Sequence, residues 1–302
     1  MPVSSRAFST RALALNCAGA ALICACAALV SAAPASAQLM LPGALQAGPQ
    51  TSSPPPAPGA APAAPAKRKP VAQKPPGPET VVGKPLALAG AHGRIALARG
   101  AGDDAMSISE LTLEGEQIEK RGEPCRLEVV AADAPLEAKL VGRPHGAQRY
   151  FAQIAACPFE FDLLDGAILA RHEGGACVFA EADCRVDPNG VWGPEAASFD
   201  DKQIKQLEKS RGRAEATMRA SFRALVAAAG KDQAAVKRFA AEQAGFSSER
   251  EMTCRSYARE ETHGFCALKL TEARNLAINA DLMALEKAGG ARKKKGESAR
   301  AP

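Results

Sequence analysis

Cysteine and histidine are the residues of this 302-residue chain whose chemistry depends most directly on spacing. A thiol oxidoreductase carries two cysteines separated by two residues, and a zinc site needs several ligands close together. Neither pattern occurs after residue 37, and the histidine–cysteine pair considered for a metal site is His172 with Cys177. The four histidines are scattered along the chain, the other three being His92, His145 and His263. We therefore expect disulfides and no metal site from the six cysteines of this part, Cys125, Cys157, Cys177, Cys184, Cys254 and Cys266.

Other catalytic motifs are missing from the sequence. It contains no Gly-x-Ser-x-Gly for a serine hydrolase and no Gly-Lys-Ser or Gly-Lys-Thr for a phosphate loop. Asp162 and Asp165 could act as an acid/base pair, but beside Gly166 they are typical of a turn at a strand end. The sequence thus predicts a non-enzymatic protein with no cofactor and no nucleic-acid partner.

The N-terminus has the features of an export signal. Arg6 and Arg11 precede an apolar run over residues 12–33, and Ala35-Ser36-Ala37 offers small residues for cleavage before Gln38. Residues 1–37 are therefore predicted to be a signal peptide, and the protein to be periplasmic or secreted. Two alternatives remain open, namely a lipoprotein acylated at Cys26 and an uncleaved membrane anchor.

Two segments are expected to be disordered. Residues 38–79 are dominated by Pro, Ala and Gly, with basic residues at 67–69 and 74, and residues 289–302 are basic. Such compositions bury too little apolar surface to offset the entropy of ordering. The basic residues of the linker either aid solubility or contact anionic polymers of the cell envelope.

Residues 80–195 are predicted to be rich in β-strands. Apolar residues alternate with polar ones, and Gly, Pro and Asp turns separate the runs. This pattern is typical of a small sandwich or barrel. Its clearest alternating positions are Leu127 and Val129, then Leu136, Ala138 and Leu140, then Phe159, Phe161 and Leu163.

Residues 198–288 are predicted to form a helical bundle, so that the whole fold is α+β. Asp200 or Asp201 caps a first long helix that ends at Gly230, and Asp232 opens a second helix that ends at Gly245. A third helix begins at a capping box of Ser248 and Glu251, and a fourth covers residues 265–288. The face that joins the helices is expected to contain Val236, Phe239, Met252, Leu268, Leu276, Ile278 and Leu282.

Part of this helical region resembles a known family. Gln243, Phe246, Arg250 and Cys254, followed by Cys266, Thr271 and Arg274, have the spacing of the LprI-type lysozyme-inhibitor-like domain. That family usually has Trp where Phe246 stands, and only Cys184 could serve as its first cysteine. The resemblance implies a helical bundle pinned by a Cys254–Cys266 disulfide in a protein that binds other envelope proteins, with a muramidase as the candidate partner.

Several residues have a structural interpretation beside the functional one. Phe246 is expected to plug the end of the bundle just past a helix, and Arg250 and Arg274 to pair with Glu251 or Glu272. Trp192, the single Trp, is expected to pack in the joint between the β and helical parts, or alternatively to be an exposed interface anchor. For the remaining cysteines, Cys177–Cys184 and Cys125–Cys157 are one set of pairings among many.

The sequence favours an exported binding protein over an enzyme. An alternative is a scaffolding protein of the envelope that touches cell-wall polymers through its linker. The net charge is +5, yet residues 80–195 are acidic and the helical segment slightly basic. A basic lysozyme would therefore be attracted to the β part and not to the helices.

Overall fold

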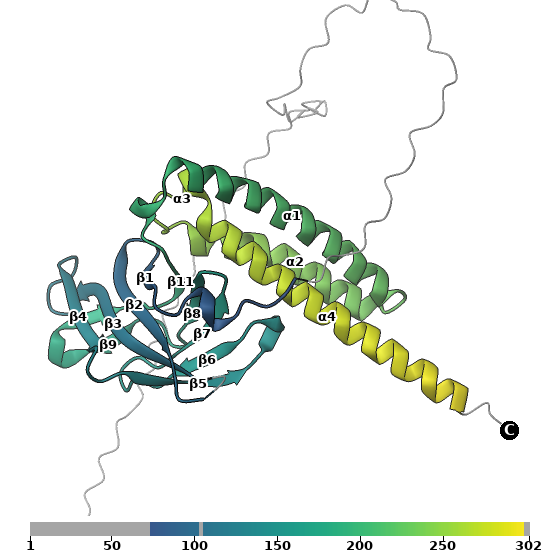
Figure 1. Ribbon diagram of the computed structural model, residues 1–302, viewed down its shortest axis with the longest axis horizontal. Coiled ribbons are helices and arrows are strands. Elements are labelled where there is room, and N and C mark those ends of the chain that lie inside the picture. The colour runs from purple at the N-terminus through teal and green to yellow at the C-terminus, as the bar shows by residue number, and fades with distance from the viewer. Residues whose placement is uncertain (1–72, 103–104, 299–302) are drawn as a thin grey trace, which may run out of the picture. The chain divides into compact units, whose positions relative to one another are not determined.

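The computed structural model describes residues 73–102 and 105–298. The predicted signal peptide, the Cys26 alternative and the linker up to residue 72 lie outside the described residues. The described strands and helices belong to one compact unit (Figure 1). No described helix combines the length and the apolar composition needed to span a membrane.

The β part contains eleven strands, all paired in antiparallel fashion. Their bounds are β1 Pro85–Leu88, β2 His92–Arg99, β3 Met106–Gln117, β4 Pro124–Val130, β5 Leu136–Gly142, β6 Arg149–Ala152, β7 Phe159–Leu164, β8 Ala167–Arg171, β9 Cys177–Phe179, β10 Cys184–Val186 and β11 Gly190–Gly193. Eight of them form a closed ring in the order β1, β2, β3, β5, β6, β7, β8 and β11, which returns to β1. Strands β4, β10 and β9 extend from the end of β3. The predicted α+β fold is confirmed, and its β part is a barrel.

The barrel is filled by the residues that alternate in the sequence. Phe159, Phe161 and Leu163 on β7 are at most 1% exposed, and Tyr150 stacks on Phe161 with ring centroids 5.5 Å apart. Side chains of successive residues point to opposite faces of a strand, so this spacing directs all three into the interior. Leu140 departs from the prediction, because it is 36% exposed on β5.

Three disulfides cross-link the fold. Cys254–Cys266 is present as predicted, and it joins the ends of two helices. The other pairings were predicted wrongly: Cys125 bonds to Cys184, and Cys157 bonds to Cys177. The physical reason is long-range strand pairing, because β4 and β10 both pair with the last residues of β3 and so bring Cys125 beside Cys184.

The helical part consists of α1 Asp201–Ala229, α2 Gln233–Cys254, α3 Glu260–His263 and α4 Phe265–Ser298. The start of α1 is the predicted one. Asp200 Oδ1 accepts from the Gln203 backbone N at 2.7 Å, and Gln203 Oε1 accepts from the Asp200 backbone N at 2.8 Å. This reciprocal pair satisfies two backbone donors at the helix end. Gly230 ends the helix with a positive φ of 59°.

Two predicted helix ends are wrong. Helix α2 continues through Gly245 to Cys254, so Ser248 and Glu251 do not cap a third helix. Glycine costs a helix about 1 kcal/mol relative to alanine, and the buried side chains of Phe239 and Phe246 on either side of Gly245 offset that cost. Helix α4 likewise passes the glycines at 289 and 290 and includes most of the predicted tail. Met252, expected in the bundle face, is 64% exposed.

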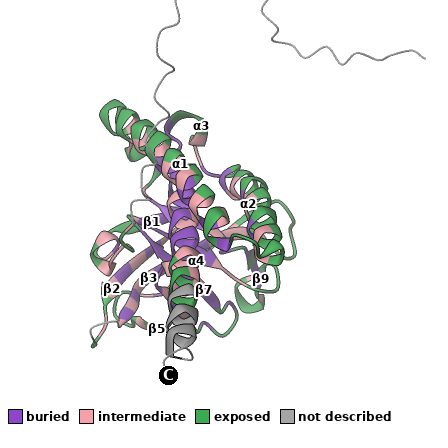
Figure 2. Cartoon of the chain, turned by 90° about the vertical axis from the view of Figure 1, so that its right-hand side faces the viewer, coloured by how far each residue is buried: buried purple, intermediate pink, exposed green. Residues whose placement is uncertain are grey.

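The helices pack on the outside of the barrel through a second hydrophobic core (Figure 2). Leu164, Leu169 and Val191 from the barrel meet Leu225, Phe239, Phe265 and Ile278 from the helices. At this contact Gly193 allows a close approach, because a Cβ there would lie 2.5 Å from Cε1 of Phe265. The two parts thus share one apolar interface.

His263, in the short helix α3, is buried and neutral at this interface. Its Nε2 donates to the Ala258 carbonyl oxygen at 2.9 Å, and its Nδ1 accepts from the Phe265 backbone N at 3.1 Å. Burial lowers the pKa of His263, although the hydrogen bond to Ala258 opposes this shift. Glu260 lies nearby, and burial raises the pKa of its carboxyl group.

We expect the free energy of unfolding to decrease as the pH falls below about 6.5. Below this pH the unfolded chain binds a proton at His263 that the folded chain does not bind. This difference lowers the free energy of unfolding by up to about 1.4 kcal/mol at one pH unit below 6.5. Urea unfolding at pH 7.5 and 5.5 should show that His263→Gln reduces this pH dependence. The exposed His92→Gln is the matched control and should keep it; an unchanged pH dependence in His263→Gln would contradict the assignment.

Candidate functional site

A groove of about 870 Å³ lies between the barrel and the end of α2. We call it the rim groove. Barrel residues form most of its wall, and Thr253, Ser256 and Tyr257 close it from the helical side. Its apolar lining includes Leu88, Ala89, Val186 and Val191. Pockets of this size accommodate small molecules or a segment of another protein.

Most charged residues of the rim groove are arranged in opposite-sign pairs, whereas Asp187 accepts hydrogen bonds from Asn189. Glu114 lies 3.3 Å from Arg126 and 3.6 Å from His92, and Glu116 lies 3.8 Å from Arg185. The Arg and His side chains are between 47% and 65% exposed in these pairs. Carboxylates that are solvated and paired with cations lack the apolar burial that tunes a general acid. This arrangement favours binding over acid/base catalysis.

Tyr257 is the buried hydroxyl group at the helical wall of the rim groove. It is 3% exposed, and its Oη donates to the Pro194 carbonyl oxygen at 3.1 Å. Burial raises the pKa of this phenol, and the nearby Glu260 carboxylate raises it further. Tyr257 therefore stays protonated and acts as a structural link between helix and barrel.

The residues that carry the family resemblance lie together between α2 and α4. Arg274 Nε donates to Gln243 Oε1 at 3.3 Å, and Arg250 Nη1 donates to Thr271 Oγ1 at 3.0 Å. Phe246 is 8% exposed, and the Arg250 guanidinium lies 5.5 Å from the centre of its ring. We call these five residues the motif cluster.

The structure corrects the expected roles of the motif cluster. Phe246 lies in the middle of α2, not past a helix end, because α2 continues through Gly245. Arg250 forms its ion pair with Glu215 at 3.6 Å, and Arg274 with Glu242 at 3.5 Å. Neither pairs with Glu251 or Glu272. The cluster therefore joins three helices, and little of it is accessible to a partner protein.

Trp192 occupies neither of the positions expected for it. Its side chain lies in the barrel core, where it is 0% exposed, and its Nε1 donates to the Pro188 carbonyl oxygen at 3.0 Å. The neighbouring Val191 instead faces the helices. Adjacent residues of β11 point to opposite sides of the strand, so Trp192 faces the barrel core while Val191 faces the helices.

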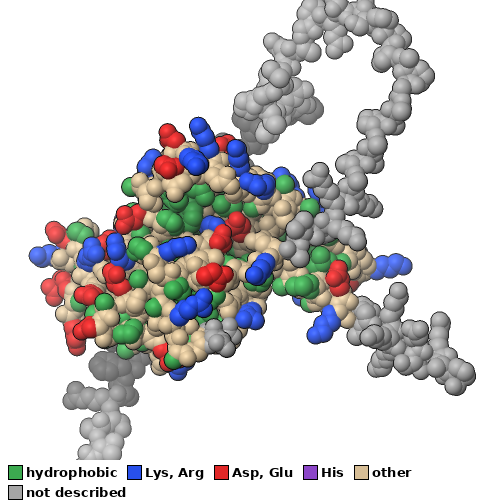
Figure 3. Space-filling model, viewed as in Figure 1, with side chains coloured by type: hydrophobic (Ala, Val, Ile, Leu, Met, Phe, Trp, Pro, Cys, Tyr) green, Lys and Arg blue, Asp and Glu red, His purple; other side chains and the backbone are tan. Residues whose placement is uncertain are grey.

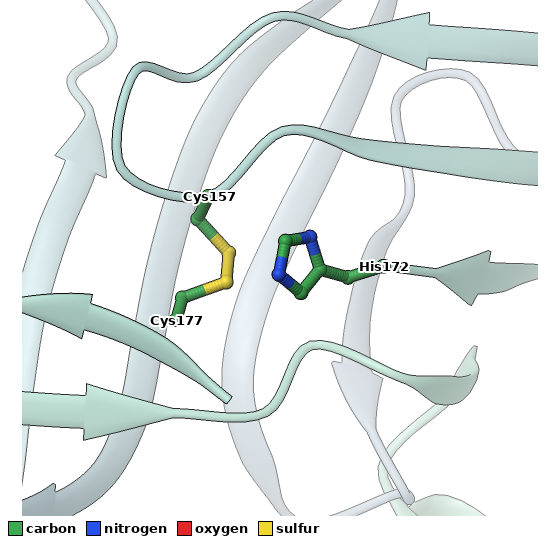
Figure 4. Close-up of side chains that lie close together, drawn as sticks. All are labelled: Cys157, His172 and Cys177. Carbon is green, nitrogen blue, oxygen red and sulfur yellow. A yellow bond between two sulfur atoms is a disulfide. The ribbon is translucent and has the colours of Figure 1, made fainter. Parts of the chain in front are cut away.

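One cluster in the described part of the chain brings three potential metal ligands close together. Figure 4 shows Cys157, His172 and Cys177, whose potential ligand atoms lie within 4.8 Å of one another. Both sulfurs belong to the Cys157–Cys177 disulfide, and metal ions bind the thiolate form of cysteine. His172 Nδ1 lies 2.6 Å from the Pro158 carbonyl oxygen. In the oxidised protein this cluster is thus a disulfide beside an anchored histidine.

The rim groove was missed by the sequence reasoning. Its paired charged residues come from the consecutive strands β2, β3 and β4 and from β10, which is far from them in the chain. One signal was available, since Glu114 and Glu116 alternate with Gly115 and so share one face of β3. Figure 3 shows acidic and basic side chains intermingled on one face of the molecule, without a single dominant patch.

No known protein family, no curated protein and no solved structure matches this chain.

Proposed function

We propose that the chain is an exported, non-enzymatic protein that binds another protein of the cell envelope in the rim groove. The observation that carries this proposal is the groove itself, with its volume of about 870 Å³, its apolar lining and its paired charges. An apolar centre surrounded by a polar rim is the usual anatomy of a protein interface. The three disulfides support an oxidising compartment.

Charge favours a basic muramidase as the partner. Residues 80–195 contain 18 Asp and Glu against 11 Lys and Arg, which is a net charge of −7. Glu119 and Glu123 are exposed between β3 and β4, close in sequence to the groove residues Glu116 and Pro124. An acidic surface steers a basic partner toward it and accelerates association at low salt. The LprI-type resemblance of the motif cluster supports the same class of partner.

The test is inhibition of a panel of basic and acidic muramidases by the oxidised full-length chain. We expect inhibition of at least one basic enzyme, with an association rate that falls as the salt concentration rises. The muramidase activity should be lost when one chain is present for each enzyme molecule, and the chain itself should not be degraded. Absence of inhibition at high micromolar protein would refute the muramidase as partner. Salt-sensitive binding to isolated cell-wall polymer in its place would support the scaffolding alternative.

A further inference from the structure

A second cavity, independent of the rim groove, lies where the motif cluster meets the barrel. Its volume is about 220 Å³, enough for about seven water molecules or a ligand of roughly ten non-hydrogen atoms. Three guanidinium groups from three different elements line it: Arg171 from β8, Arg250 from α2 and Arg274 from α4. We call it the arginine pocket.

Hydrogen bonds within the protein use only some of the donors of the three arginines. Each guanidinium has five N–H donors. Arg171 donates through Nη1 to Asp162, Arg250 through Nη1 to Thr271, and Arg274 through Nε and Nη1 to Gln243 and Glu242. Nη2 of Arg274 has no acceptor within the described part of the chain, but it is buried from solvent and so does not open into the pocket.

The carboxylates around the arginine pocket are shared between arginines. Glu215 lies within 4 Å of Arg219 and Arg250, and Glu242 within 4 Å of Arg238 and Arg274. Asp281 also interacts with Arg238 and Arg274, so these carboxylates balance much of the positive charge around the pocket. The pocket lining itself has three guanidinium groups against two carboxylates.

Two further carboxylates line the pocket itself. Asp162 is neutralised, because it accepts from both Arg149 and Arg171. Glu249 is exposed to solvent. An unpaired buried carboxylate would strongly repel an anion placed between the arginines. Asp162 and Glu249 repel such an anion less.

Apart from His145, the rest of the pocket wall is apolar. Leu164 and Leu169 come from the barrel, and Phe246, Leu270 and Ala277 come from the helices. A bare inorganic anion would leave this surface without a partner. A carboxylate attached to a small apolar body would satisfy both the guanidinium donors and the apolar wall.

We propose that the arginine pocket binds the carboxylate of a small apolar acid. The source of this group is either a free carboxylic acid or the C-terminal residue of a peptide. This site is separate from the rim groove, so its occupancy does not depend on the function proposed for that groove.

Isothermal titration calorimetry on the oxidised full-length chain tests the proposal with four probes: hexanoate, N-acetyl-leucine, N-acetyl-leucine amide and inorganic phosphate. We expect one of the two carboxylates to bind at least 10-fold more tightly than the amide and than phosphate. Tighter binding of N-acetyl-leucine identifies a peptide C-terminus, and tighter binding of hexanoate a free acid. Equal affinity for the amide, or no heat with either carboxylate at 10 mM, would overturn the proposal.

A pair of variants with equal net charge locates the site. Arg250→Gln removes a guanidinium from the pocket, and Arg255→Gln removes one from the exposed end of α2, where the side chain is 75% exposed. The first should weaken binding of the carboxylate at least 10-fold and the second less than twofold. Ala277→Leu, which fills the pocket without changing charge, should also weaken it at least 10-fold. Equal effects of the two arginine variants would show binding by net charge alone and refute the assignment.

Discussion

Replacing Cys125 and Cys184 together by alanine should destabilise the protein by about 4 kcal/mol. This disulfide closes a loop with a sequence separation of 59 residues, and the entropy that a disulfide removes from the unfolded chain increases with loop length. Both sulfurs also belong to side chains packed in or against the barrel core. Urea unfolding of the oxidised protein, monitored by circular dichroism, measures the loss.

The other two disulfides provide matched controls for this prediction. Cys157–Cys177 has a separation of 20 residues and Cys254–Cys266 one of 12, so the same argument gives about 3 kcal/mol for each, with the shorter loop slightly lower. The expected order of the three losses follows loop length. A larger loss for Cys254–Cys266 than for Cys125–Cys184 would show that loop entropy does not determine the stabilisation.

Replacing Asp162 by asparagine should cost about 3 kcal/mol. The Asp162 side chain is 9% exposed in the middle of β7, where Oδ1 accepts from Arg149 Nε at 2.6 Å and Oδ2 from Arg149 Nη2 at 2.9 Å. Oδ2 also accepts from Arg171, and the hydrogen bond with Asp162 raises the pKa of the Arg149 guanidinium. Asparagine would leave two guanidinium groups facing a neutral amide, and breaking a buried ion pair costs several kcal/mol.

Asp165 is the control for the Asp162 prediction. It lies three residues later in the turn before β8, its side chain is 67% exposed, and it pairs with Lys269 at 3.5 Å. Lys269 is buried, but it keeps its shorter ion pair with Glu272 at 2.9 Å when Asp165 is replaced. Asparagine is also favoured in turns, so Asp165→Asn should cost less than about 1 kcal/mol. Similar losses for the two variants in urea unfolding would contradict the role assigned to Asp162.

The same two residues show what the sequence can and cannot predict. Asp165 is the turn residue that its position before Gly166 indicates. Asp162 was expected in the same role, but Arg149 and Arg171 on the neighbouring strands hold it in a strand instead. A turn signal is local, whereas this ion-pair network depends on strand pairing that no local pattern reveals.

The helices also differ in which of their ends the local sequence predicts. Asp200 and Gly230 mark the true ends of α1, because capping chemistry depends on a few neighbouring residues. Gly245 does not end α2, since the packing of the second core outweighs a local preference. Closure of the barrel by the β1–β11 pairing depends on contacts between distant segments, and so does the rim groove, which joins β3 and β4 to β10 and the end of α2. The sequence therefore predicts the class of the fold and the motif cluster's residues, but not the groove.

The most direct test of the account is the ratio of inhibition constants for two tryptophan variants against the muramidase that the panel identifies. Ser256→Trp places a large side chain in the rim groove, and Ser247→Trp places the same side chain on an exposed part of α2 that does not line it. We predict that Ser256→Trp inhibits at least 100-fold more weakly than Ser247→Trp, while both unfold at wild-type urea concentrations. Equal inhibition constants for the two folded variants would contradict the claim that the rim groove is the binding site.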